Sequence, residues 1–482
     1  MDILRNSLSL LVATSLSAVS SAEETETAPA MMKAIRLHAY GGIEVLQYED
    51  APRPEPKEGE ILIRVVAAGV NPVDAKIRSG IFARMMGTKL PLIPGLDVAG
   101  MVEKAGPNVT RFKPGDAVYA CLNMQTQGGY AEFAIAKVPE IDKSIALLPL
   151  ENLSENTEDT ALANGIREEV ISALSKIKEL KLTAPAEVMD NRSGGENLRE
   201  IATQLGVAHV LEGNIRRADD SIRINLKLFD AGNDRLLWNA GFDRALGDAP
   251  ALKQELAAEI VAAIRTAVVE AEPTGSEASA KPKGLSYEGA AAMPVAATTA
   301  WQALVEIAQL SSGQTVLIHG GSGGVGSFAI QIAKARGAKV IATASAANQQ
   351  FLRDLGADQT IDYNATKFEE VVKEVDVVLD SVAGETLKRS YGVVKKGGIV
   401  VSLLEPPDKA ELDARGIRGT AFMVSPNASL LSELRKLIEA KKLKPVVTKT
   451  FPLAEGAKAH EAIETGHTRG KIVLRVAEDP KN

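Results

Sequence analysis

Cysteine is almost absent from the sequence, and its scarcity excludes two kinds of stabilisation. Cys121 is the one cysteine in 482 residues, so the chain can form neither an intrachain disulfide nor a cysteine-based metal cluster. The five histidines are scattered and offer no ligand-spaced pair. With 45% hydrophobic and 24% charged residues, the composition is typical of a soluble globular protein, and the length predicts two to four domains.

A basic surface pattern is missing as well. The formal net charge is −7 and no basic stripe with interleaved aromatic residues occurs, so nucleic acid is not expected as a partner. The apolar run of residues 8–19 is too short to span a membrane as a mature helix. Behind Arg5 it resembles a secretory signal peptide within residues 1–30, which favours a periplasmic protein over a cytoplasmic one. The alternative is an extension ahead of an internal start at Met32.

The stretch "TVLIHGGSGGVGSFAIQIAKARGAKVIATAS", residues 315–345, predicts a strand, a tight turn, a helix and a second strand. Its glycines have the spacing G-x-G-x-x-G. Such glycines allow the turn, the approach of backbone to a diphosphate, and close packing of helix on strand. The diphosphate would lie on the unpaired N–H groups at the helix N-terminus. The candidate diphosphate-binding residues are Gly321, Ser322, Gly323, Gly324, Val325 and Gly326.

An acidic residue is missing where an NAD site needs one. The acid that accepts from the ribose 2′-hydroxyl is expected about 20 residues beyond the glycines, but residues 334–353 contain neither Asp nor Glu. Hydroxyl groups and a cation would hold a 2′-phosphate, which a carboxylate would repel. The sequence therefore predicts NADP(H), with Lys339 within reach and with the candidate ligands Thr343, Ser345, Arg353 and Tyr363.

The chain divides into segments of different character. Residues 31–140 alternate short strands with turns and predict a β-rich domain. Residues 285–424 contain the cofactor motif and further strands. Residues 425–482 end in "GKIVLRV", a strand that would return to the β-rich domain. Residues 141–270 have their own pattern of strands and amphipathic helices, and a polar linker over 271–284 follows, so this segment predicts a compact inserted α/β domain.

The motifs "AAGVNPVDAKIRSG", "PLIPGLDVAG", "GGSGGVG", "GADQTIDY" and "ETGHTRGKIVLRV" run through the outer segments. Together they resemble the zinc-independent quinone oxidoreductases of the medium-chain dehydrogenase/reductase superfamily, over residues 31–140 and 281–477. The resemblance implies an α/β fold in which a GroES-like catalytic domain accompanies a Rossmann domain with a doubly wound parallel sheet. It further implies NADP(H), a quinone or enone substrate in the cleft between these domains, and a homodimer.

Two positions separate the chain from the metal-dependent relatives of that family. Those relatives bind catalytic zinc through Cys and His, where this sequence has Asn71 and Leu96, and neither side chain suits a tetrahedral zinc site. No metal is therefore predicted. The resemblance places Asn71, Asp74, Lys76 and Tyr130 in or around the cleft as catalytic candidates, with direct contact and structural support left open for each. Tyr40 is a possible wall residue, and the stretches that would pass the nicotinamide ring contain Ser381, Val382, Phe422 and Val424.

The middle segment contains "KSIALLPLENLSENTED" and "GVAHVLEGNIRRADDSIRINLKLFDA". It resembles the TolB-like amino-terminal domain attached to bacterial cyclases and repeat proteins. No catalytic constellation occurs in it, so the resemblance implies sensing or binding of a protein partner. Two functions follow as hypotheses: an NADPH-dependent reductase of quinones or α,β-unsaturated carbonyls, or a catalytically silent NADPH-binding sensor or scaffold whose inserted domain binds a partner. For the reductase, the proton would come from solvent or from Tyr130.

Overall fold

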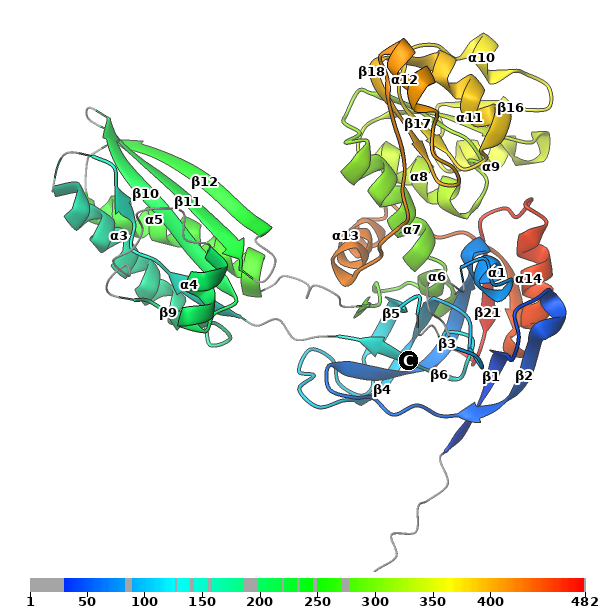
Figure 1. Ribbon diagram of the computed structural model, residues 1–482, viewed down its shortest axis with the longest axis horizontal. Helices are drawn as coiled ribbons and strands as arrows, with labels where there is room; N and C mark the ends of the chain where they lie inside the picture. Colours follow the sequence, from blue (N-terminus) through cyan, green and yellow to red (C-terminus); the bar gives the residue numbers. More distant parts are fainter. Residues whose placement is uncertain are drawn as a thin grey trace, which may run out of the picture.

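The computed structural model describes residues 30–82, 89–125, 128–138, 143–154, 156, 158–185, 198–218, 221–231, 235–245, 249–269 and 277–480. The signal-peptide-like segment of residues 1–30 thus lies outside the described residues, apart from Ala30. Within the described ranges, no helix combines the length and apolarity needed to cross a membrane. Figure 1 shows three groups of strands, each with its own helices.

The β-rich part is organised around β3, which is buried along most of its length. A sheet of seven strands has the order β13-β5-β4-β3-β21-β20, with β6 also paired to β3, and β1 pairs with β2. The expected return of the chain terminus is confirmed, because β21 pairs antiparallel with β3. The elements are β1 (Met31–Leu37), η1 (Ile43–Val45), β2 (Leu46–Pro52), β3 (Glu60–Val70), α1 (Pro72–Arg78), β4 (Asp97–Ala105), β5 (Ala117–Cys121), β6 (Phe133–Lys137), β13 (Ala278–Ala280), α6 (Tyr287–Ala291), β20 (Val447–Pro452), η6 (Leu453–Glu455), α14 (Gly456–Glu464) and β21 (Lys471–Arg475).

The cofactor motif lies in a sheet of six strands in the order β16-β15-β14-β17-β18-β19, whose neighbouring pairs are all parallel. This is a doubly wound order in which the chain reverses direction beside β14, and ligands bind at the carboxyl edge there. The elements are α7 (Pro294–Trp301), η3 (Gln302–Ile307), β14 (Thr315–Ile318), α8 (Gly324–Ala335), β15 (Lys339–Ala344), η4 (Ala346–Asn348), α9 (Gln349–Asp354), β16 (Gln359–Asp362), α10 (Phe368–Val371), β17 (Val375–Asp380), α11 (Gly384–Ser390), η5 (Tyr391–Val393), β18 (Val394–Ser402), α12 (Lys409–Arg415), β19 (Arg418–Ala421) and α13 (Ala428–Glu439).

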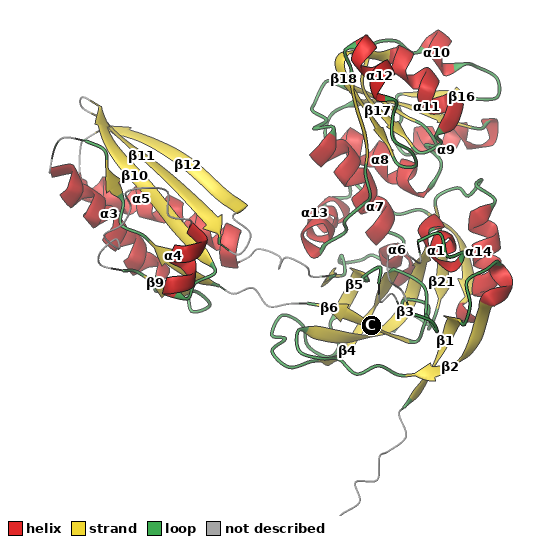
Figure 2. Cartoon of the chain, viewed as in Figure 1, coloured by secondary structure: helices red, strands yellow, loops and turns green. Residues whose placement is uncertain are grey.

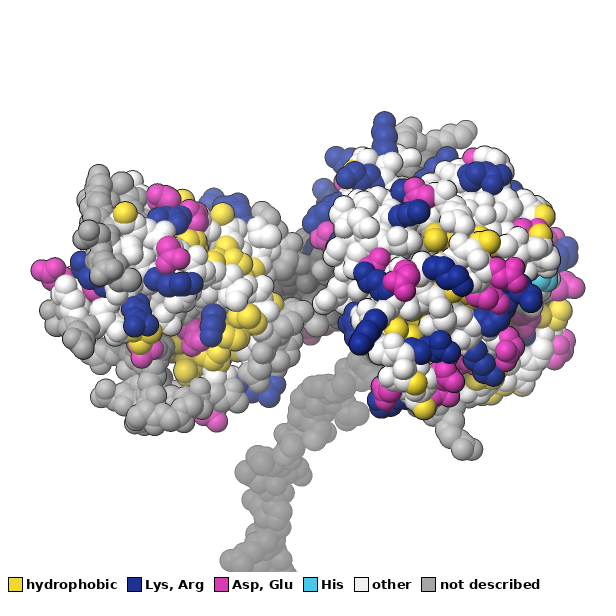
Figure 3. All heavy atoms as spheres, turned by 90° about the horizontal axis from the view of Figure 1, so that it is seen from above, with side chains coloured by type: hydrophobic (Ala, Val, Ile, Leu, Met, Phe, Trp, Pro, Cys, Tyr) yellow, Lys and Arg dark blue, Asp and Glu magenta, His cyan; other side chains and the backbone are white. Residues whose placement is uncertain are grey.

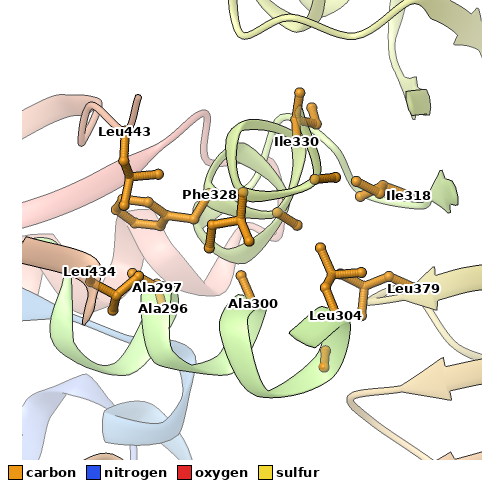
Figure 4. Packing of buried hydrophobic residues seen from close by; sticks show 14 of the residues in the cluster. Ala296, Ala297, Ala300, Leu304, Ile318, Phe328, Ile330, Leu379, Leu434 and Leu443 are labelled. Carbon is orange, nitrogen blue, oxygen red and sulfur yellow. The ribbon is translucent and has the colours of Figure 1, made fainter. Parts of the chain in front are cut away.

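Two apolar cores hold helices against the two faces of this sheet, and Figure 2 shows helices and sheet together. In the larger core, small residues of α7 such as Ala297 and Ala300 let this helix approach Phe328 of α8 closely (Figure 4). Leu434 of α13 belongs to the same core. The terminal segment pairs with the β-rich sheet from β20 onward, and α13 already contacts that part, because the Tyr119 hydroxyl of β5 donates to Leu431 O.

The middle segment forms its own sheet in the order β12-β11-β10-β7-β9, with β8 paired to β10. Helices α3 and α5 pack on one face of this sheet, and α4 packs on the other. Strands β10 and β11 pair antiparallel along their length. The elements are β7 (Ser144–Leu147), β8 (Glu151–Asn152), α3 (Glu158–Leu174), β9 (Lys181–Thr183), α4 (Leu198–Leu205), β10 (His209–Ala218), β11 (Ser221–Asp230), β12 (Arg235–Ala245), α5 (Ala249–Ile264) and the π-helix η2 (Arg265–Val269).

The end of the predicted linker differs from expectation. Residues 278–280 form β13, which pairs with β5, so the polar linker of residues 271–284 does not extend through them. Next to β13, Glu277 donates its N–H to Lys137 O at 2.8 Å, and Lys137 donates its N–H to Glu277 Oε2 at 2.9 Å. The chain therefore leaves and re-enters the β-rich part at adjacent points, which is the geometry that an inserted domain requires.

Charges of both signs are interspersed on the face of the molecule shown in Figure 3. This face carries lysine and arginine side chains beside aspartate and glutamate side chains. The distribution agrees with the modest net charge of −7.

Candidate functional site

The glycine-rich turn connects β14 to α8 at the carboxyl edge of the parallel sheet. Gly321 donates its N–H to Thr343 O, and Gly323 donates its N–H to Gly320 O, both at 3.0 Å. A Cβ added at Gly326 would lie 2.3 Å from Gly320 O, whereas a Cβ at Gly323 would meet only that oxygen, at 3.4 Å. Gly326 is therefore required by the packing of helix on turn. Gly323 leaves open space before the N-terminus of α8, whose free N–H groups suit a diphosphate.

Two of the four predicted 2′-phosphate ligands lie at the carboxyl ends of β15 and β16, and a third, Arg353, contacts the second residue of β16. Ser345 directly follows β15, and its Oγ accepts from Asn348 Nδ2 at 3.2 Å. Tyr363 follows β16 and is 54% exposed. Arg353 of α9 donates to Thr360 Oγ1 on β16 at 3.1 Å. Lys339 begins β15 and so lies at the opposite edge of the sheet from Ser345, because about 3.3 Å of rise per residue separates the strand ends. The expectation that Lys339 lies within reach is wrong.

Thr343 is buried, and its hydroxyl faces the domain interior. Its Oγ1 lies 3.1 Å from Nδ1 of His319, whose Nε2 lies 3.0 Å from Ser390 Oγ. Because Ser390 donates its own proton to Thr386 O at 2.6 Å, His319 donates from Nε2 and accepts the Thr343 proton at Nδ1. Burial lowers the pKa of His319 to about 3, so the ring is neutral. The Thr343 hydroxyl therefore bonds to His319 and is not free to bind a phosphate. The Thr343 carbonyl supports the glycine turn by accepting from the N–H of Gly321.

The loops after β17 and β19 contain the residues predicted to pass the nicotinamide ring. Asp380, whose pKa burial raises, accepts from the N–H of Val382 at 3.2 Å and so shapes the first loop. Ser381 donates its hydroxyl to the carbonyl of the residue before the glycine turn at 2.9 Å, and this bond places the loop beside the turn. Val382 is 49% exposed, while Phe422 and Val424 are partly buried.

A buried polar cluster lies where the β-rich part meets the turn. Asn71 precedes α1, is 2% exposed, and donates from Nδ2 to Asp97 Oδ2 at 2.9 Å. Lys471 at the start of β21 donates from Nζ to Asn71 Oδ1 and, at 3.2 Å, to Val70 O. Asp97 also accepts from the N–H of Val295, in the first turn of α7, at 3.0 Å. Each polar atom of the Asn71 amide thus faces a charged partner, and the orientation of the amide is fixed.

The cluster touches the glycine turn directly. A Cβ at Gly324 would lie 3.0 Å from Lys471 Cδ, and Gly470 donates its N–H to Ser322 O at 2.8 Å. The candidate cofactor turn and the candidate catalytic residue Asn71 are therefore joined through the start of β21.

Asp74 and Tyr130 support this cluster through hydrogen bonds that lead to the backbone of Asn71. Asp74 Oδ2 accepts from the N–H of Asn71 at 2.8 Å and from the Tyr130 hydroxyl at 2.9 Å, and both side chains are fully buried. Of the roles left open for Tyr130, the geometry supports bracing. Lys76 lies on the exposed side of α1, away from this cluster. Tyr40 packs beside Gly80, just beyond the end of α1.

Burial dominates the electrostatics of the three ionisable groups nearest to Asn71. It raises the pKa of Asp74 to about 7 and that of Asp97 to about 6, and it lowers the pKa of Lys471. The attraction between Lys471 and the two carboxylates opposes each of these shifts. The cluster therefore depends on its balance of charge, because removing one partner would leave another buried charge uncompensated.

Comparisons with known proteins agree with this arrangement. A family model described as "Alcohol dehydrogenase GroES-like domain" matches residues 57–143, and one described as "Zinc-binding dehydrogenase" matches residues 355–474. The NADPH-dependent alkenal/one oxidoreductase (chloroplastic) of Arabidopsis thaliana is 30% identical over 468 residues, which cover 95% of this chain and 83% of that protein. The chain belongs to the medium-chain dehydrogenase/reductase superfamily.

Further proteins similar to this medium-chain dehydrogenase/reductase are also named as reductases or oxidoreductases. The 2-methylene-furan-3-one reductase of Solanum lycopersicum is 29% identical over 472 residues, which cover 95% of this chain and 84% of that protein. The solved structure of the quinone oxidoreductase from Coxiella burnetii matches with a TM-score of 0.60 at 26% identity, and covers 93% of this chain and 100% of that chain. These matches confirm the predicted α/β fold, with its GroES-like domain and its doubly wound sheet.

The middle segment of this medium-chain dehydrogenase/reductase has a match of its own. A family model described as "HilA/YgeH-like transcriptional regulator, second domain" covers residues 141–259. That range falls within the predicted insertion, 141–270, and the likeness to TolB-like domains stays a prediction.

Sequence reasoning missed two residues of the site in this medium-chain dehydrogenase/reductase, Asp97 and Lys471. Both belong to quoted motifs, "PLIPGLDVAG" and "GKIVLRV". The available signal was a charged residue within an apolar strand, which calls for a buried partner.

Proposed function

We propose that the protein transfers hydride from NADPH to a quinone or to the β-carbon of an α,β-unsaturated carbonyl, without a metal. The observation that carries this proposal is the contact between the cofactor turn and Asn71 through Lys471. It places an oriented, uncharged amide beside the turn, at a position where the metal-dependent family members have a zinc ligand. The names of the tomato and Arabidopsis relatives support an enone substrate, and the name of the Coxiella structure supports a quinone.

The residues of the turn fit NADP(H). Open space at Gly323 and the free N–H groups of α8 suit the diphosphate, and Ser345 with Tyr363 offers hydroxyl groups beside a position without an acid. When bound, the cofactor supplies the hydride. The chain contributes binding and orientation, which is the main catalytic effect where no residue acts as a nucleophile.

The polar cluster has the role of holding the nicotinamide end of the site in place. Asn71 is fixed between Lys471 and Asp97, and Asp97 also binds the first turn of α7. These bonds hold the β-rich part and the cofactor domain in a fixed relative position. The Tyr130 hydroxyl is committed to Asp74 in a fully buried position. The proton that completes the reduction therefore comes from solvent rather than from Tyr130.

Independence of zinc is part of this proposal. Leu96 is buried and apolar, and Asn71 already uses both polar atoms of its amide in hydrogen bonds. Among the described residues, no group of three His, Cys, Asp or Glu side chains is placed to hold a metal ion. Enones and quinones delocalise the developing negative charge, so their reduction proceeds without a Lewis acid. The direct test is NADPH consumption with 1,2-naphthoquinone or an enal, compared with a simple ketone.

Replacing Ser345 with Asp should reverse the cofactor preference. The new carboxylate would repel the 2′-phosphate and accept from a 2′-hydroxyl, so NADPH affinity should fall by about tenfold or more while NADH affinity rises. Ser345→Ala is the matched control, because it removes the hydroxyl without adding charge. Fluorescence titration of both reduced cofactors measures the effect. Equal affinity of the unaltered protein for NADPH and NADH would refute the assignment of this position.

A second candidate function is a catalytically silent NADPH-binding sensor whose inserted domain binds a protein partner. The specific observation in its favour is the match of residues 141–259 to a domain of transcriptional regulators. Export, a homodimer and the likeness to TolB-like domains remain predictions beside it.

Deleting residues 141–274 separates the two functions. Because Lys137 and Glu277 bond to each other, the shortened chain should fold, bind NADPH and keep hydride transfer, with a changed KM as the main effect. Residues 141–270 alone, which have their own core, should melt cooperatively. If the deletion variant binds NADPH but lacks an activity that the full chain has, then the insertion supplies part of the active site.

A further inference from the structure

The loop that precedes β21 is held firmly against the glycine turn. Gly470, with φ of +60°, donates its N–H to Ser322 O at 2.8 Å. Thr468 Oγ1 donates to Ala462 O at 3.2 Å, and the hydroxyl of Thr448 donates to Arg469 O. The backbone around Arg469 is thus fixed from both sides. This loop belongs to the motif "ETGHTRGKIVLRV", and of that motif the proposed function uses Lys471 alone.

The Arg469 side chain extends from this loop to the helix that follows Ser345. Its guanidinium carbon lies 5.3 Å from the centre of the Phe351 ring, in α9. The next residue of α9, Leu352, packs on the turn itself, since a Cβ at Gly321 would lie 3.1 Å from Leu352 Cδ2. The guanidinium therefore lies beside α9, and the backbone next to Arg469 lies beside the diphosphate turn.

Arg469 keeps its hydrogen-bond donors available. Its side chain is exposed, and within the described ranges it forms no ion pair with an acidic residue. The neighbouring cations differ: Lys334 is paired with Asp358 at 2.9 Å, and Arg353 donates to Gln350 and Thr360 at 3.1 Å each. Contact with an aromatic face leaves the N–H edge of a guanidinium free, and that edge matches the oxygens of a phosphate.

We propose that Arg469 binds the 2′-phosphate of the adenosine ribose and is a determinant of the preference for NADPH. This inference rests on the proposed cofactor and adds a residue outside the sequence pattern that suggested it. The loop provides a preorganised cation, because its backbone is anchored at Ser322 and its side chain is oriented by Phe351. A fixed guanidinium that faces a doubly charged phosphate forms charge-assisted hydrogen bonds.

The test is the binding of NADPH, NADH, 2′,5′-ADP and 5′-AMP to Arg469→Ala, Arg469→Lys and the unaltered chain. Arg469→Ala should weaken NADPH and 2′,5′-ADP by about tenfold or more. It should leave NADH and 5′-AMP unchanged, and Arg469→Lys should recover part of the loss. Arg415→Ala, an exposed arginine on α12 that pairs with Glu411, is the matched control and should bind all four ligands normally.

Two results would overturn the assignment while leaving the proposed function intact. Equal weakening of NADPH and NADH would place Arg469 on the diphosphate, and unchanged binding of all four ligands would remove it from the site. Failure of the unaltered chain to bind NADPH would overturn the proposed function, and this assignment with it. A thermal melt of each variant shows that an altered affinity does not reflect unfolding.

Discussion

Gly326→Val should abolish NADPH binding. The first side-chain carbon would lie 2.3 Å from Gly320 O and 2.7 Å from Gly321 Cα, and both are backbone atoms of the turn that cannot rotate away. The helix must therefore shift from the turn, which costs about 1–3 kcal/mol in strain and displaces the N–H groups that face the diphosphate. Fluorescence titration and thermal melting should show affinity and stability falling together.

Gly323→Ala should lower NADPH affinity without lowering the stability of the fold, so it separates these two effects. A Cβ there has only Gly320 O nearby, at 3.4 Å, so the fold should keep its stability. The methyl group would nevertheless occupy the approach of the diphosphate and lower NADPH affinity. Gly392→Ala is the matched control, since its Cβ would meet one arginine nitrogen at 4.0 Å. Normal NADPH binding by Gly326→Val would show that the diphosphate turn has been placed wrongly.

Lys471→Met should destabilise the protein by about 3–5 kcal/mol, as expected when one partner of a buried ion pair is removed. The ammonium is buried and binds Asn71 Oδ1, and Asp97 binds the same amide from the other side. Without the cation, Asp97 would remain as an uncompensated buried charge. Lys449→Met, on the exposed side of β20, is the matched control and should be nearly neutral. Chemical denaturation measures both variants.

The deficit of Lys471→Met should depend on pH in a defined direction. Burial raises the pKa of Asp97 from 3.8 to about 6 and that of Asp74 from 3.8 to about 7. Raised acids stabilise the native state most below their ordinary pKa, and this stability is lost as the pH rises through about 6 to 7. Lys471 limits that loss of stability. The stability of the variant should therefore fall furthest below that of the unaltered protein at pH 8, and the two should be most similar at pH 5.

A charge-balanced double variant tests the same pair. Lys471→Met combined with Asp97→Asn removes both charges, so it should cost less than the sum of the two single changes. Additive losses would show that Lys471 and Asp97 do not compensate each other, and the account of the cluster would then fail.

The cofactor turn was predictable because its geometry is encoded locally. The two strands expected within residues 315–345 are β14 (Thr315–Ile318) and β15 (Lys339–Ala344). Helix α8 begins at Gly324, ahead of the helix-forming residues, because the glycines themselves provide its first turn. The separate core of the middle segment has a local signal too, since the apolar stripes of its helices pack against its own sheet.

The hydrogen bonds of the polar cluster could not be predicted, because they join segments that are distant in the sequence. Asn71, Asp97 and Lys471 come from the end of β3, the start of β4 and the start of β21, and only the paired strands bring them together. The short strand β13 was taken for linker, because its partner β5 precedes the whole insertion. The sequence predicted Thr343 as a phosphate ligand from its position along the chain, but the direction of its side chain is set by the contact with His319.

Transfer of deuterium from NADPH to substrate would show directly whether the protein is a hydride-transferring reductase. NADPH carrying deuterium at C4, on one face or the other, would be incubated with an enal and with the unaltered chain in the presence of a metal chelator. The product would then be analysed by mass spectrometry and NMR. We expect one deuterium at the β-carbon of the product, from one of the two labelled cofactors, at a rate that the chelator does not change. A chain that binds NADPH but transfers no deuterium to enals or quinones, or that transfers it only when zinc is retained, would contradict the account.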